Sequence, residues 1–262
     1  PDAFAKAANA IIFYGSEGLG LAGSASVAAA AADLLQETNH TGKPNSGLIG
    51  AWPRANDQGA WEMGYEPADD LAEELKGKAV YVAGADPAGD DPPLAKALKS
   101  AKFLVVQDIS LTATAGLADV VLPAQAYTER EGTFTSGERR VQRFYPAVPV
   151  TGEARPDFVI TSQIARGMGY ILEGTSPAIV FDFLATDVKS FEGLNYAKLA
   201  EITEQWPIVG RGDLYYGGTM YENTQGLGAQ LTSAAGRGET FKLSAVKKTK
   251  SLRPKEGELL AV

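Results

Sequence analysis

The chain has 262 residues, 45% of them hydrophobic, and a formal net charge of -8 with a pI near 4.9. This length can bury a substantial core in one large domain or two modest ones, whereas the acidic excess argues against nucleic acid as a partner, because phosphate backbones bind Lys and Arg. Cysteine is absent and His40 is the only histidine, which excludes disulfides, cysteine-ligated zinc, iron-sulfur clusters and multi-histidine metal sites from this chain.

Two features of the sequence concern membranes and processing. No apolar run approaches the roughly 20 residues that a membrane-spanning helix needs, so no membrane span is predicted. The first ten residues, PDAFAKAANA, include no initiator methionine, no basic segment and no signal-type apolar segment. We therefore expect the chain to be a fragment of a longer polypeptide.

The first predicted elements are a strand, a glycine turn and a helix. Residues 10–14 (AIIFY) form an apolar run typical of a buried strand, and residues 21–37 are rich in alanine, a strong helix former. The glycines between them lack the GxGxxG spacing of a dinucleotide loop, so a simple turn is favoured over a phosphate-binding loop. Gly42 and Pro44 end the helix, and His40 is expected to be a capping or surface residue.

Residues 47–65 are predicted to be a long polar loop, from their content of Gly, Pro and Asn. The loop concentrates side chains that could present amides and a guanidinium to a heteroaromatic or phosphate ligand: Trp52, Arg54, Asn56, Asp57, Gln58 and Trp61. The same groups could equally satisfy one another, because buried polar groups are paired whether or not a ligand is present. Both interpretations stay open on sequence grounds.

The middle of the chain predicts repeated strand-helix-strand units. A short helix over residues 69–76 precedes a buried strand at 79–82, and a crossover helix at 94–99 leads to a second strand at 103–106. A third strand follows at 120–122. Three parallel strands in chain order, covered by helices, make an α/β fold with a Rossmann-like parallel sheet.

Short hydroxyls and one carboxylate follow the strand at 103–106. Asp108 comes directly after it, and Ser110, Thr112 and Thr114 follow at alternate positions. In open α/β sheets, ligands bind at the carboxyl ends of the strands. The sequence therefore predicts a small-molecule site here.

The remainder of the chain is predicted to be less regular. A polar loop rich in Thr, Gly, Glu and Arg follows Pro123 and runs to Phe144. Amphipathic helices are expected at 155–169, 178–188 and 196–204, and irregular structure beyond residue 210.

Five motifs resemble the molybdopterin oxidoreductase superfamily, and they occur in the order found in formate dehydrogenases and their relatives. They are ANDQGAWEMG at 55–64, VYVAGADP at 80–87, VQDISLTATA at 106–115, ADVVLP at 118–123 and EGTFTSGERRVQ at 131–142. The resemblance extends from residue 10 to about residue 207. It implies the α/β fold of those enzymes, with an irregular C-terminal extension.

Within the superfamily, residues 212–228 (GDLYYGGTMYENTQGLG) look most like the large iron-sulfur subunit of bacterial NADH-quinone oxidoreductase, respiratory complex I. Such subunits carry their iron-sulfur clusters in an amino-terminal part that this chain lacks. The resemblance implies the peripheral-arm subunits of complex I as partners and a location on the cytoplasmic face of the bacterial membrane. It also implies that this portion generally holds no molybdenum.

The superfamily's cofactor is a bis-guanine-dinucleotide molybdopterin, and its binding loops can be matched to this chain. The matching positions are Asn56, Gln58 and Gly59 in the polar loop, Gly84, Asp86 and Pro87 after the first strand of the sheet, and Asp108 and Thr112 after the second. The superfamily usually has Glu-Asn-Pro where this chain has Ala85-Asp86-Pro87, and Thr-Glu-Thr where it has Thr112-Ala113-Thr114. A carboxylate in place of an amide loses donors and adds a charge facing phosphate, which weighs against a bound cofactor.

Two functions follow from the resemblance. The favoured one is a cofactor-free structural and assembly portion of complex I, with no catalytic residue and no metal ligand of its own. The alternative is the cofactor-binding portion of an active, formate dehydrogenase-like molybdenum enzyme. The predicted domains are the end of an α/β domain with the polar loop (1–66), a Rossmann-like domain (67–209) and an irregular C-terminal extension (210–262).

Overall fold

The computed structural model describes residues 2–15, 20–42, 45–68, 70–201, 228–232 and 235–238. They divide into two compact units, which are described separately below. One unit comprises Pro1–Gly59, Thr135–Arg140 and Gln230–Val262, and the other comprises Ala60–Phe134 and Val141–Ala229. The predicted domain boundaries at residues 66 and 209 stay predictions.

The first unit is built on a strand-helix-strand element. Its helices and strands are α1 (Asp2–Ala5), β1 (Ile11–Tyr14), α2 (Gly20–Glu37) and β2 (Gly47–Gly50), followed by the start of α3 (Asp57–Glu62). Strands β1 and β2 pair in parallel, with Ile11 opposite Gly47, and α2 makes the crossover that a parallel pair requires. The strand predicted at 10–14 and the helix predicted at 21–37 are confirmed.

Two predictions in this unit are wrong. Residues 47–65 are not a continuous loop, because they contain β2 and α3. Of the two alternatives for His40, the surface position is wrong, because only 1% of the residue is exposed, whereas its backbone amide does cap the end of α2. Its Nδ1 lies 2.8 Å from the Thr38 hydroxyl and its Nε2 lies 2.9 Å from the Ala7 carbonyl oxygen. The histidine is buried beyond the helix end because Asn39, at φ 57°, turns the chain back and the His40 amide bonds to the Leu35 carbonyl at 2.8 Å.

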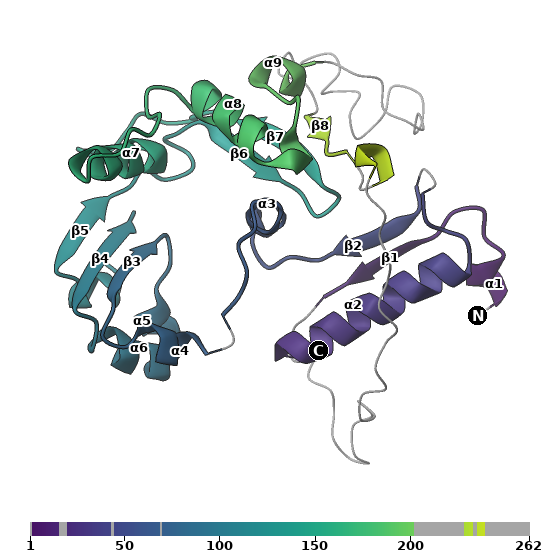
Figure 1. Cartoon of the computed structure of the whole chain (residues 1–262), viewed down its shortest axis with the longest axis horizontal. Helices are drawn as coiled ribbons and strands as arrows, with labels where there is room; N and C mark the ends of the chain where they lie inside the picture. Colours follow the sequence, from purple (N-terminus) through teal and green to yellow (C-terminus); the bar gives the residue numbers. More distant parts are fainter. Residues whose placement is uncertain are drawn as a thin grey trace. The chain divides into compact units, whose positions relative to one another are not determined.

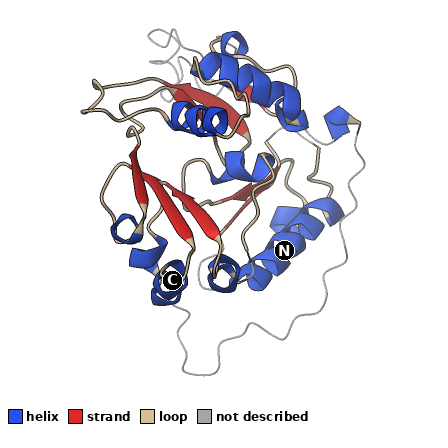
Figure 2. Cartoon of the chain, turned by 60° about the vertical axis from the view of Figure 1, so that its left-hand side comes forward, coloured by secondary structure: helices blue, strands red, loops and turns tan. Residues whose placement is uncertain are grey.

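The second unit contains a three-stranded parallel sheet in the order β3-β4-β5. Its elements through the sheet are α4 (Leu71–Leu75), β3 (Ala79–Ala83), α5 (Pro87–Asp90), α6 (Pro92–Leu98), β4 (Phe103–Asp108), the 3-10 helix η1 (Ala115–Leu117) and β5 (Val120–Pro123). Figure 1 shows the three strands side by side in chain order, with α4, α5 and α6 grouped beside them, and Figure 2 shows the same sheet from another direction. The predicted Rossmann-like parallel sheet is confirmed.

Helix and sheet meet in a compact core on one face of β4. Leu104 and Val106, two residues apart and therefore on the same face of the strand, pack with Leu98 of α6 and Ala115 of η1. Leu104 is 2% exposed and Val106 is 0% exposed. This core packs β4 against α6 and η1, and it thereby fixes the position of Asp108 at the end of β4.

The remaining elements are helices and a small sheet, and most of their residues belong to the second unit. The elements are β6 (Gly132–Thr135), β7 (Arg140–Phe144), α7 (Asp157–Gly167), α8 (Pro177–Asp187), η2 (Lys189–Phe191) and α9 (Tyr196–Leu199), with β8 (Ala229–Gln230) and η3 (Ala235–Arg237) towards the end of the chain. Strands β6, β7 and β8 form a sheet in that order. The helices predicted at 155–169 and 178–188 are confirmed as α7 and α8.

Two further expectations change in this region. The stretch from Pro123 to Phe144 was expected to be a polar loop, but it contains β6 and β7, whose alternating side chains include the stacked rings of Phe134 and Phe144, 4.6 Å apart. The helix predicted at 196–204 ends at Leu199, and residues 202–227 lie outside the described residues, as does most of the predicted C-terminal extension. None of the helices in the described part of the chain is long and apolar enough to cross a membrane.

Candidate functional site

The carboxyl ends of β3, β4 and β5 lie at one edge of the parallel sheet, which we call the carboxyl edge. The register places Asp108 opposite Pro123, and the Gly84 amide continues the ladder by bonding to the Gln107 carbonyl at 2.9 Å. Of the predicted positions, Asp108 ends β4, and four others follow β3 or β4 at this edge: Gly84, Asp86, Pro87 and Thr112. The structure therefore brings these five together, as the spacing of the strands predicts.

Asp86 and Thr114 connect the loop after β3 with the loop after β4. Oδ1 of Asp86 accepts hydrogen bonds from the Thr114 amide at 2.8 Å and from the Thr114 hydroxyl at 2.7 Å. The same oxygen caps α5 by accepting from the Gly89 amide at 3.3 Å, with Pro87 at the first position of that helix. These bonds hold the pKa of the Asp86 carboxyl below its usual value, the Thr114 hydroxyl contributing most.

Asp108 and Thr112 form turns of their own beyond β4. Oδ1 of Asp108 accepts from the Ser110 amide at 3.1 Å, and the Thr112 hydroxyl oxygen accepts from the Ala115 amide at 3.1 Å. Both side chains are partly exposed. Beside them, the side chains of Ile109 and Leu111 are 64% and 86% exposed. The loop after β4 thus offers a carboxylate, a hydroxyl and apolar surface in one short stretch.

Gly84 leaves open space at the end of β3. Its φ of 61° is a conformation that other residues rarely adopt, and a Cβ built there meets no atom within 4 Å. A ligand can therefore approach the backbone closely at this position, whereas a side chain would be strained and would occupy the approach.

The polar loop, which belongs to the other unit, satisfies many of its own polar groups. Nε1 of Trp52 donates to Oε1 of Gln58 at 2.9 Å, and Oδ1 of Asn56 accepts from the Thr135 amide at 2.9 Å. Gln58 is only 8% exposed. A Cβ at Gly59 would lie 2.4 Å from the Asn56 Oδ1, so a larger residue there would displace the Asn56 side chain. Two interpretations were left open for residues 47–65, and these hydrogen bonds favour the one in which the polar side chains bond within the protein.

Gln107 is the second-to-last residue of β4 and was not identified from the sequence as a site residue. It is 2% exposed, accepts a hydrogen bond from the Tyr81 hydroxyl and donates one to Asp157, which also pairs with Arg130. Burial raises the pKa of the Tyr81 hydroxyl, and it lowers that of Arg130. The signal was the placement of an amide at the end of an otherwise apolar strand, directly before Asp108.

Thr114 was recognised as one of a series of hydroxyls but not as a site residue. It is 0% exposed, and its partner lies 28 positions earlier in the chain. The Asp-Pro pair at 86–87 is a local signal for a helix cap, and it could have identified Asp86 as a capping residue. No local signal predicts the bond between the two residues.

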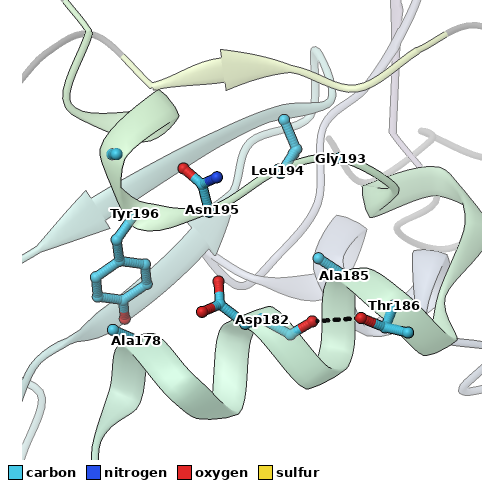
Figure 3. Close-up of a pocket in the computed structure, with 9 residues that line it drawn as sticks. Ala178, Asp182, Ala185, Thr186, Gly193, Leu194, Asn195 and Tyr196 are labelled. Carbon is cyan, nitrogen blue, oxygen red and sulfur yellow. Dashed lines mark hydrogen bonds between the residues drawn. The ribbon is translucent and has the colours of Figure 1, made fainter.

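Two cavities in the described part of the chain lie away from these residues. Figure 3 shows the first, of about 530 Å³, between α8 and the loop that leads to α9, with Asp182, Asn195 and Tyr196 around it. In it the Thr186 hydroxyl donates to the Asp182 carbonyl oxygen at 2.9 Å. The second, of about 400 Å³, lies beside the end of β5 and is lined by Pro123, Arg155 and Gln163 among others. None of the predicted site residues lines either cavity.

The described residues also show what this part of the chain could hold. They contain no group of three or more His, Cys, Asp or Glu placed to bind a metal ion. At the carboxyl edge they do provide acceptors, hydroxyls and an open backbone position. The edge therefore fits a ligand rich in N–H and O–H donors, such as a nucleoside, better than it fits a bare metal ion.

Comparison with known proteins shows which family the chain resembles. Residues 2–167 match the family "Molybdopterin oxidoreductase". Over 214 residues the chain is 34% identical to F420-dependent formate dehydrogenase 2 subunit alpha of Methanococcus maripaludis, an alignment that covers 67% of this chain and 32% of that protein. It is 41% identical over 137 residues to F420-dependent formate dehydrogenase subunit alpha of Methanocaldococcus jannaschii, covering 50% and 20% of the two chains.

A third relative is formate dehydrogenase H of Escherichia coli, 37% identical over 134 residues, which cover 50% of this chain and 19% of that protein. The chain thus spans a third or less of the length of these relatives. They are formate dehydrogenases, and they give no support to the expected assignment to the large iron-sulfur subunit of complex I. Because the family match covers more than half of the sequence, this chain belongs to the molybdopterin oxidoreductase family.

Proposed function

We propose that this chain is the portion of a formate dehydrogenase-like molybdenum or tungsten oxidoreductase that holds a guanine nucleotide of the molybdopterin cofactor. The relatives named above carry formate dehydrogenase activity in their names, and the chain aligns with only part of each. The proposal therefore assigns this chain a share in cofactor binding within a larger catalytic unit. It corresponds to the alternative function drawn from the sequence.

The observation that carries the proposal is Asp108 at the carboxyl edge. Its Oδ1 bonds to the Ser110 amide, and among the described residues none donates to its Oδ2. Guanine has N–H donors on its Watson–Crick edge, which a carboxylate can accept. The exposed side chains of Ile109 and Leu111 add apolar surface on which the face of a base can lie.

The remaining candidate positions suit the nucleoside more than the phosphates. Gly84 gives the ligand access to the backbone, and the Thr112 hydroxyl can still donate a proton while its oxygen accepts from Ala115. The positions at this edge include two carboxylates and no cation, so backbone amides or other parts of the protein would hold the phosphates. When bound, the metal centre of such a cofactor supplies the two-electron redox step.

The acidic Asp86 weighs less against a cofactor than its sequence position suggests. Its Oδ1 accepts both Thr114 hydrogen bonds and caps α5. An asparagine, which the superfamily usually has at this position, offers the same side-chain oxygen as an acceptor. The exchange therefore preserves the local structure.

A cofactor-free portion of the large iron-sulfur subunit of complex I is the second candidate. The resemblance of residues 212–228 favours it, and residues 212–227 lie outside the described part of the chain. Under this second candidate, the partners are the peripheral-arm subunits of complex I, and the location is the cytoplasmic face of the membrane.

The experiment that separates the candidates is elemental and pterin analysis of the full-length protein, purified from a host that makes the cofactor. The proposal expects molybdenum or tungsten, oxidised pterin and guanine nucleotide in stoichiometric amounts. Asp108→Ala is expected to lower the guanine nucleotide content by about tenfold, as expected for the loss of a hydrogen bond to a charged group. Asp187→Ala, an exposed carboxylate at the end of α8, is the matched control and should leave that content unchanged. A wild-type protein that contains neither metal nor pterin would overturn the proposal in favour of complex I.

A further inference from the structure

The loops after β3 and β4 are tied together beyond the point where the sheet ends. The last ladder bond between these strands joins the Gly84 amide to the Gln107 carbonyl. Past it, the Thr114 amide and hydroxyl both donate to Asp86 Oδ1, and the Thr114 hydroxyl oxygen accepts from the Ala88 amide at 2.9 Å. Thr114 thus bonds to two successive parts of the first loop.

The Thr114 hydroxyl makes these bonds without access to solvent. The residue is 0% exposed. Its one proton goes to Asp86, and one of its oxygen lone pairs accepts from Ala88. Thr114 is therefore placed to hold loops and not to touch a ligand.

The residues that a ligand can reach lie on both sides of this connection. Gly84 stands two positions before Asp86, and Thr112 stands two positions before Thr114. Asp108 opens the second loop, where β4 ends. The ladder bond from Gly84 to Gln107 already places Gly84 beside Asp108. The Asp86–Thr114 bonds place the later part of the second loop, with Thr112, relative to the first loop. A ligand that contacts Gly84, Asp108 and Thr112 together therefore depends on them.

Helix capping alone does not account for the arrangement. The capping bond from Asp86 to the Gly89 amide stays within the first loop, whereas the bonds to Thr114 cross to the second. The bonds that cross are also shorter, at 2.7 and 2.8 Å against 3.3 Å for the cap. The Asp86 carboxylate thus connects the two loops in addition to capping α5.

We propose that Asp86 and Thr114 are positioning residues that hold the two loops as one nucleotide-binding surface, so that cofactor retention depends on a threonine that the cofactor does not touch. This inference rests on the function proposed above. It also changes the role of Asp86, from a candidate contact with the cofactor to a support for the residues that make the contact.

Two matched pairs of substitutions test the proposal in the full-length protein. Thr114→Val removes the hydroxyl while keeping the shape, and Thr114→Ser keeps the hydroxyl. Asp86→Ala removes the acceptor, and Asp86→Asn keeps it. We expect Thr114→Val and Asp86→Ala to release the cofactor about tenfold faster than wild type, and Thr114→Ser and Asp86→Asn to stay within about twofold. Release is measured as pterin and guanine nucleotide retained on the protein after dilution, at a temperature at which every variant is folded.

A core substitution separates positioning from general loss of stability. Val141→Ala alters a fully buried side chain in β7 and is expected to lower the thermal unfolding midpoint while leaving cofactor release unchanged. If Thr114→Val releases the cofactor at the wild-type rate, the positioning role is wrong although the proposed function stands. If Val141→Ala accelerates release as much as Thr114→Val at an equal loss of midpoint, the effect is one of stability and the proposal also fails. Wild-type protein without any pterin would instead remove the proposed function, and the positioning role with it.

Discussion

The indole nitrogen of Trp52 donates a 2.9 Å hydrogen bond to Oε1 of Gln58. Two polar-loop side chains that could have faced a ligand are therefore bonded to each other. Gln58 is 8% exposed, whereas Trp52 is 38% exposed, so the bond satisfies the more buried of the two partners. This relationship makes the loop a part of the fold of its unit, and its energetic contribution can be measured.

Trp52→Phe should destabilise the protein by about 1 kcal/mol, the usual net value of one hydrogen bond. Trp61→Phe is the control, because Trp61 is 53% exposed and surface changes usually stay within about 0.5 kcal/mol. Urea unfolding followed by circular dichroism measures both. Equal effects of the two substitutions would show that the Trp52–Gln58 bond contributes nothing specific.

Gly137→Ala should destabilise the protein by roughly 1–3 kcal/mol through overpacking. A Cβ at Gly137 would lie 2.7 Å from the Gly50 carbonyl oxygen, and backbone cannot move aside as a flexible side chain can. Gly116→Ala is the control, since a Cβ there meets nothing within 4 Å. Thermal unfolding of both variants checks the difference, and a Gly137→Ala midpoint equal to that of wild type would contradict the close approach.

Tyr196 should make the protein sensitive to alkaline pH. Burial, followed by the nearby Glu131 carboxylate, raises the pKa of Tyr196 to about 12 from 10.0, against an opposing effect of Arg143. A raised folded-state pKa gives stability that is complete below pH 10 and is lost as the pH rises towards 12. The full loss is about 3 kcal/mol.

Tyr196→Phe should remove this dependence on pH, because no phenol remains to ionise. Chemical unfolding at pH 8, 10 and 11 compares the slopes of the two proteins. Tyr127→Phe, a change at a side chain 64% exposed, should keep the wild-type slope. An unchanged slope in Tyr196→Phe would assign the alkaline loss to other groups.

Thr114→Val should weaken the protein at neutral pH more than at acid pH. Hydrogen bonds from Thr114 lower the pKa of Asp86 below 3.8 in the folded state. A lowered pKa contributes stability that is present above the unfolded value and disappears as the pH falls through the folded value. The difference between wild type and variant should therefore shrink below about pH 3.8. Urea unfolding at pH 7 and pH 3 measures it, and a difference that is the same at both pH values would argue against this linkage.

The sequence correctly predicts the strands that consist of runs of continuous apolar residues. Residues 79–82, 103–106 and 120–122 are such runs, and all three form the parallel sheet. The missed strands β2 (GLIG), β6 (GTFT) and β7 (RVQRF) are short and contain Gly, Thr or Arg. Their strand conformation comes from pairing with distant segments, which local propensity does not encode.

In the candidate site too, features set by the local sequence were predictable and features set by distant contacts were not. The position of Asp108 follows from the end of an apolar strand, so the carboxyl edge was predictable. The partner of Asp86 was not, because Thr114 lies 28 residues away and only the packing of η1 against β4 brings it near. Likewise, the sequence left open whether the polar side chains of residues 47–65 bond to a ligand or within the protein. The partner of Asn56, Thr135, lies 79 positions along the chain and has no local signal.

The isolated parallel bridge between Ala124 and Arg155 has a consequence for how this region can change during evolution. The Arg155 amide bonds to the Pro123 carbonyl at 3.1 Å, and the Gln125 amide bonds to the Arg155 carbonyl at 3.0 Å. The segment between Ala124 and Arg155 therefore begins and ends beside β5, and it contains β6 and β7. The entropy of closing such a segment rises only slowly with its length, and its residues 146–150 are exposed. Insertions at these exposed residues should therefore be tolerated without disturbing the parallel sheet, while β6, β7 and the two anchor points stay in place.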